Sequence, residues 1–182
     1  MDETTYLDDA KLQLRKLKTM AERALEQAGD GRWFVAPDPD SNSLAVIMKH
    51  ISGNLRSRWT RFLETDGEKP DRNRDGEFEI GPDDTPARLR ERWEQGWKVL
   101  FETLESLRPG DLEKTVTIRR EPHTVLQAIN RQLSHYSLHV GQIIYLAKHL
   151  AGKSWTSMSI PKGKSKEFEV AKDGKPYLAE PR

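Results

Sequence analysis

The sequence predicts an all-α protein, a four-helix bundle with long connections and an irregular C-terminal tail. Four segments of roughly 22 to 30 residues repeat apolar side chains with the 3–4 spacing of an amphipathic helix. Capping and stop residues flank these segments, and only residues 115–118 have the composition of a strand. With 182 residues and a net charge of +1, the chain fits one folded domain rather than a disordered one.

The first two helices are expected over residues 4–28 and 42–64. Gly29 follows the first, and glycine is the residue type most favoured just after a helix C-terminus. The second begins among Ser41, Asn42 and Ser43, which are all good N-caps. The apolar positions of the first helix are Leu7, Ala10, Leu14, Leu17, Ala21, Ala24 and Ala28, and those of the second include Leu44, Met48, Ile51, Leu55 and Phe62.

The third and fourth helices are expected over residues 85–107 and 122–151. The third has Pro86 at its first helical position, where the missing backbone N–H does no harm. The fourth has the most regular pattern and ends at Gly152. Its apolar positions are Leu126, Ile129, Leu133, Tyr136, Val140, Ile143, Ala147 and Leu150.

The connectors over residues 65–83 and 108–121 are longer than a tight turn needs. Such connectors allow a chain to run back along the bundle, so an up-down-down-up order is possible, although length alone does not require it.

The tail divides into two parts. We expect residues 1–168 to form the domain, with residues 154–168 docked on the bundle, because Trp155, Met158 and Ile160 are too apolar to trail in solvent. Residues 169–182 are expected to form a flexible tail.

Composition excludes several classes of function. The chain has no cysteine, which excludes a disulfide scaffold, a Cys-ligated metal and a Cys nucleophile. Near-neutral charge argues against a nucleic-acid partner or a membrane surface. The acidic start is unlike a signal peptide, and no apolar run reaches the ~20 residues of a membrane span. We therefore expect a soluble cytoplasmic protein.

The histidines are the strongest candidates for chemistry. His135 and His139 are four residues apart, so both rings project from one face of the fourth helix. His50, in the second helix, is a plausible third ligand, with Gly53 and other small neighbours leaving room for a metal and a substrate. Tyr136 follows His135, so the His-Glu-x-x-His mechanism is excluded. From the spacing of the His135 and His139 pair alone, ordinary hydrogen-bonded histidines are the favoured interpretation.

Two other clusters are weaker. Residues 71–76 match the start of an EF-hand loop, but Pro82 occupies the twelfth position, where a glutamate is required, so we interpret them as a solvated acidic turn. Arg56, Arg58 and Arg61 are interpreted as a solvated helix face.

The sequence around the histidines resembles the DinB-like superfamily. The resemblance rests on His135 to Ile143, with the pattern His-x-x-x-His-x-Gly-Gln-Ile, and on His50 within Met48–Ile51. It covers roughly residues 1–152. The segment from Ser159 to Phe168 resembles an uncharacterised branch of that superfamily.

The resemblance implies an up-down-down-up four-helix bundle in which three histidines bind one divalent metal ion, commonly zinc or nickel. Mapped by motif, the ligands are His50, His135 and His139. Characterised relatives include thiol-dependent S-transferases and a mycothiol-dependent isomerase, and many members form dimers. We therefore expect a homodimer, with Trp59 and the tryptophans of the third helix, Trp93 and Trp97, on its helical interface.

The expected function is a metal-dependent enzyme acting on a small-molecule substrate, in first place a small-thiol-dependent S-transferase. An open three-imidazole site can lower the pKa of bound water to ~7 or bind a thiol as thiolate. Without a cysteine in the chain, the thiol must be a low-molecular-weight cofactor. The alternatives are a metal-dependent hydrolase and a non-catalytic metal- or ligand-binding bundle. Asn54 and Gln142 are candidates for supporting the ligands, no general acid or base is assigned, and metal uptake should fall below pH ~6.5.

Overall fold

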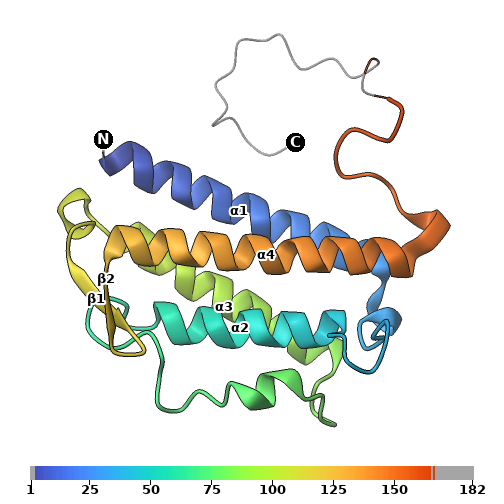
Figure 1. The fold of residues 1–182 in the computed structure, drawn as a ribbon, viewed down its shortest axis with the longest axis horizontal. Helices are drawn as coiled ribbons and strands as arrows, with labels where there is room; N and C mark the ends of the chain where they lie inside the picture. The colour runs from blue at the N-terminus through green and yellow to red at the C-terminus, as the bar shows by residue number, and fades with distance from the viewer. Residues whose placement is uncertain (1–2, 165, 167–182) are drawn as a thin grey trace.

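The computed structural model describes residues 3–164 and 166 and is mostly helical (Figure 1). Four long helices form the bundle, and a two-stranded sheet lies beside it. The helices are α1 (Glu3–Ala28), α2 (Leu44–Trp59), α3 (Pro86–Ser106) and α4 (Val125–Ala151).

The bundle is built from two helix pairs, because α1 packs mainly on α4 and α2 mainly on α3. The starts of α1 and α4 lie together, since the Tyr6 hydroxyl donates to Asn130 Oδ1 at 2.8 Å. Their ends also lie together, where Thr156 N donates to Gln27 Oε1. In Figure 1 the colour runs along α2 and α3 in the opposite direction. The middle of α2 lies beside the middle of α4, where the Tyr136 hydroxyl donates to Asn54 Oδ1.

Local capping explains where the helices begin. Ser43 and Thr85 accept hydrogen bonds from the backbone of α2 and α3, and Thr124 forms a capping box with Gln127 at the start of α4. The predicted end of the second helix at residue 64 is wrong. Thr60 is extended and Arg61 has a φ of 49°, so α2 stops at Trp59.

A β-hairpin precedes α4. Residues 115–118 form β1 (Thr115–Ile118), which pairs antiparallel with β2 (Glu121–Thr124). The sequence suggested only the first of these strands. The expected helix start at residue 122 is therefore wrong, because residues 121–124 belong to the sheet and Thr124 caps the helix.

The tryptophans expected at a dimer interface are core residues. Trp59, Trp93 and Trp97 are each at most 2% exposed within the single chain, so they cannot present a surface to a second copy. The homodimer itself stays a prediction.

The start of the tail touches the bundle. Trp155 and Met158 pack against the core, whereas Ile160 is 42% exposed. The expected flexible tail over residues 169–182 lies outside the described residues. None of the described helices combines the length and apolar character needed to cross a membrane.

Candidate metal centre

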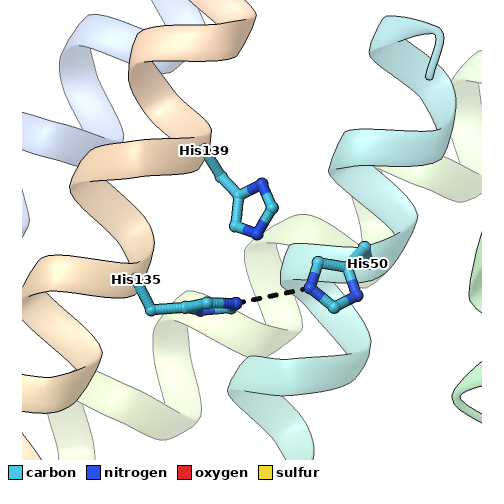
Figure 2. A group of neighbouring side chains, drawn as sticks. All are labelled: His50, His135 and His139. Carbon is cyan, nitrogen blue, oxygen red and sulfur yellow. Dashed lines mark hydrogen bonds between the residues drawn. The ribbon is translucent and has the colours of Figure 1, made fainter. Parts of the chain in front are cut away.

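The three predicted ligands lie together in the structure. His50 projects from α2 toward His135 and His139, which project from neighbouring turns of α4 (Figure 2). One ring nitrogen from each lies within 4.8 Å of a ring nitrogen on both of the others. Nε2 of His50 is 3.4 Å from Nε2 of His135. Nitrogens bound at about 2.1 Å to a tetrahedral zinc lie about 3.4 Å apart, so this spacing suits one ion.

Two of the rings are oriented by hydrogen bonds at Nδ1. His50 Nδ1 lies 2.9 Å from Glu77 Oε2, and His139 Nδ1 lies 2.8 Å from Gln142 Oε1. A carboxylate oxygen and an amide oxygen only accept, so both Nδ1 atoms donate. The lone pair of each Nε2 is then available for a metal.

His135 supplies an independent indication that the cluster suits a metal. Its Nδ1 is buried and has no hydrogen-bond partner among the described residues. Its Nε2 has one hydrogen-bond contact among the described residues, with Nε2 of His50 at 3.4 Å. Two facing Nε2 atoms can share only one proton between them, whereas a cation between them would bind both lone pairs, so the three side chains fit a divalent ion.

Glu77 is the functional residue that the sequence interpretation missed. Its side chain is 8% exposed, and Arg72 holds it with two hydrogen bonds of 2.8 Å, from Nε and Nη2. Burial raises the pKa of Glu77, but the hydrogen bonds from His50 and Arg72 outweigh this effect and lower it overall. The buried carboxylate therefore stays charged and fixes the His50 ring.

Gly53 makes room for Glu77 rather than for a substrate. A Cβ at Gly53 would lie 2.7 Å from Cδ of Glu77, too close for any side chain. Gly53 is three residues after His50, so this small residue brings the carboxylate to the same part of α2 as the ligand. The expectation that Gly53 leaves open space is therefore wrong.

Burial keeps the α4 ligands neutral. It lowers the pKa of His135 to about 3, with smaller contributions from His139 and His50. Burial also lowers the pKa of His139, partly opposed by its hydrogen bond with Gln142. A metal binds neutral imidazole. Protons therefore compete with a metal for these two rings only below the pH of ~6.5 that is expected for free imidazole.

The other candidates have different surroundings. Asn54 lines the cavity beside the histidines, and its Oδ1 accepts from the Tyr136 hydroxyl at 3.0 Å. His123 lies on β2, where it bonds to the Glu121 carbonyl and to Arg131. His149 is exposed near the end of α4. Only His50, His135 and His139 form a metal-sized cluster within the described ranges.

The histidines line a cavity of about 240 Å³. Its lining contains five arginines but no aspartate or glutamate among the described residues. A larger cavity, of about 570 Å³, has Glu77 but no histidine in its lining among the described residues. Because only the smaller of these two cavities contains the histidines, it is the candidate site.

The connector between α2 and α3 differs from its sequence interpretation. Within the expected acidic turn, Asp71 pairs with Arg56, and Asn73 Oδ1 accepts from Gly76 N. Glu77, directly after it, is buried. Arg58 is also buried, at 5% exposure, so the expectation of a fully solvated arginine face is wrong at this residue.

Comparison with known proteins gives a family. No curated protein and no solved structure matches the chain significantly. Residues 2–164 match the family described as "Protein of unknown function (DUF1572)". This match spans most of the chain and includes all three clustered histidines, so the protein belongs to the DUF1572 family.

Proposed function

We propose that His50, His135 and His139 hold one divalent ion of the zinc or nickel class. The convergence of three ring nitrogens within 4.8 Å carries this proposal. Three protein ligands leave at least one position open on such an ion, as in catalytic rather than structural sites. The resemblance to DinB-like proteins supports the same ligand set. The opposed directions of the two helix pairs support an up-down-down-up order.

We infer further that the site serves a metal-dependent enzyme, a small-thiol-dependent S-transferase. When bound, the ion supplies Lewis acidity that stabilises a thiolate near neutral pH. The chain contains no cysteine, so a small cofactor thiol supplies the sulfur. In the transfer, an S–C bond forms, the bond to the leaving group breaks, and the thiol proton passes to solvent.

The cavity favours thiol chemistry over hydrolysis. Attack by water is commonly assisted by a carboxylate base, and none of the described residues lining the cavity is acidic. Glu77 is committed to His50 and Arg72 instead. A thiol needs less assistance because it is far more acidic than water. The task of the protein side chains is then to orient three imidazoles and to receive the substrate.

Metal analysis of the purified protein tests the first step. We expect about one zinc or nickel per chain, and a sharp loss of metal when His50, His135 or His139 is replaced by Ala, because two imidazoles hold such an ion weakly. His123→Ala and His149→Ala are matched controls that should retain it. Full metal content in all three ligand variants would show that the site is elsewhere.

Turnover tests the second step. Metal-loaded protein should consume a small thiol in the presence of an alkylating electrophile, and the rate should fall to background after chelation. His139→Ala should show the same background rate while keeping a helical circular dichroism spectrum. Metal binding without turnover of any thiol–electrophile pair would favour the non-catalytic binding bundle. Metal-dependent ester or amide cleavage alone would favour the hydrolase.

A further inference from the structure

The cavity that contains the histidine cluster has a strongly cationic lining. Three of its arginines, Arg74, Arg119 and Arg131, are between 43% and 52% exposed at the side chain, so they face solvent around the histidines. The side chains of the other two, Arg58 and Arg72, are buried. A cavity with this lining attracts anions, and a divalent ion would add two further positive charges.

The exposed arginines are only partly neutralised by acidic side chains. Arg119 donates from Nε to Glu68, and no partner is found for its two terminal nitrogens among the described residues. Arg131 contacts Glu121 and His123 through Nη1 alone. The guanidinium of Arg74 lies 5.2 Å from the Phe78 ring centre. Its ion pair with the exposed carboxylate of Asp75 is long, at 4.0 Å. Several N–H donors therefore remain for a ligand.

Arg58 adds a buried donor. Its two terminal nitrogens donate to the Gly67 carbonyl and to Glu68. Its Nε is buried and has no partner within residues 3–164 and 166. Arg58 lines the cavity, so its charge adds to the positive potential that an anion would meet there.

The hairpin that carries Arg119 is strained. Arg119 and Arg120 form the two-residue turn between β1 and β2, with φ values of 56° and 65°. Such turns favour Asn and Gly, because bulky residues are strained at positive φ. Asp66 holds the turn by accepting the backbone N–H groups of both arginines, at 2.8 and 2.7 Å. The chain thus keeps a costly turn that brings one arginine to the cavity.

Arg131 approaches the same cavity from α4. It lies four residues before His135, so both project from the same face of the helix one turn apart. Two arginines from separate elements, the hairpin and α4, therefore flank the histidine cluster. This arrangement suits an oxyanion that spans both guanidinium groups, because each can bind it through two N–H donors.

We propose that this cavity binds an oxyanion group of the substrate, a carboxylate or a phosphate, through Arg119 and Arg131. The inference deepens the proposed function by naming the substrate class of the same site, and it rests on that function only for the reaction at the metal. The guanidinium groups orient the anion and leave the uncharged part of the substrate beside the three histidines. A neutral electrophile of the same size would bind weakly.

Calorimetric titration of the metal-free protein tests the anion site apart from the metal. Succinate and inorganic phosphate are compared with succinamide, the neutral analogue of succinate. We expect at least one anion to bind tenfold or more tightly than succinamide, and the tighter of the two identifies the oxyanion. Arg119→Gln and Arg131→Gln should each weaken that anion about tenfold, whereas Arg119→Lys should retain part of the affinity.

Arg120→Gln is the matched control, because Arg120 shares the strained turn but does not line the cavity. It should change anion affinity less than twofold. Equal binding of anions and succinamide, or equal losses in the Arg119 and Arg120 variants, would overturn the proposal. Metal content measured on the same variants should stay at the wild-type value. A failed anion test with normal metal content would therefore reject only the oxyanion site, and a failed metal analysis would reject only the metal centre.

Discussion

The two sides of the histidine cluster come from different kinds of structure. On one side, His135, His139 and Gln142 lie on one regular helix, so the spacing of the chain fixes their relative positions. On the other side, His50 depends on Glu77, which comes from the irregular connector between α2 and α3. The first side is determined locally, and the second exists only when the connector is folded.

Gln142 and Glu77, which support the ligands on the two sides, also differ in burial. Gln142 is exposed, so its hydrogen bond with His139 competes with water. Glu77 is 8% exposed and its partner Arg72 is 3% exposed. A buried charge that loses its partner is destabilising, whereas an exposed amide that loses its partner is rehydrated. The connector side should therefore be the more fragile one.

Glu77→Gln should give the largest effect. It removes the negative charge that pairs with Arg72, which then keeps only its contact with Glu68, at 3.3 Å. We expect a loss of about 3 kcal/mol in the free energy of unfolding, measured by urea denaturation. Zinc affinity, measured by competition with a chromophoric chelator, should fall roughly 10- to 100-fold because the His50 ring loses its orienting carboxylate.

Gln142→Ala is the matched change on the α4 side. It should alter the free energy of unfolding by less than about 0.5 kcal/mol, since the side chain is exposed. Zinc affinity should fall by less than about tenfold. Similar losses in the two variants would show that the connector adds nothing special to the site.

This difference also explains what the sequence could reveal about the site. His135 and His139 are recognisable because a four-residue spacing on a periodic helix has one geometric outcome. The contact between Glu77 and His50 joins residues 27 apart through a connector without a repeating pattern, so no local rule predicts it. The available signals were the unusual length of the connector and a glycine inside a helix next to a candidate ligand.

The fold follows the same pattern. Ser43, Thr85 and Thr124 cap the starts of α2, α3 and α4. Each of these starts lies within a few residues of the start that the sequence predicts. Phe62 continued the apolar spacing of the second helix and led to an overlong prediction. It is buried for another reason, because the chain turns at Arg61 and packs the Phe62 ring 4.9 Å from that of Trp59.

Two glycines, one on each side of the cluster, allow a sharper test. Gly53→Ala places a methyl group against Glu77, and we expect a loss of about 1 to 3 kcal/mol in unfolding free energy, together with weaker zinc binding. Gly141→Ala meets no atom within 4 Å on α4, so it should stabilise the protein by about 0.5 to 1 kcal/mol through helix propensity. Equal signs for the two changes in thermal or urea denaturation would contradict the assigned packing of Glu77 on α2.

A further difference between the two sides is a pH dependence that belongs to the α4 side. The pKa of His135 is about 3 in the folded protein, against ~6.5 for an unfolded imidazole. Between these values the unfolded chain binds more protons, so the stability that is fully present above pH ~6.5 is lost as the pH falls. His139 acts in the same direction, because its pKa is also lowered.

We expect the metal-free protein to lose about 1 kcal/mol of unfolding free energy from His135 between pH 7 and pH 5.5. His135→Gln removes this titration and should flatten that part of the profile. The carboxylates with lowered pKa values, such as Glu77 and Asp84, lose their stabilisation only at more acidic pH, so the chosen window separates them from the histidines. An unchanged slope in His135→Gln would mean that the ring is hydrated rather than buried between α2 and α4. The same burial that makes the His135 ring costly to protonate also presents it to a metal in its neutral form. A flat pH profile in the wild-type protein would therefore weaken both the burial of His135 and its proposed role as a metal ligand.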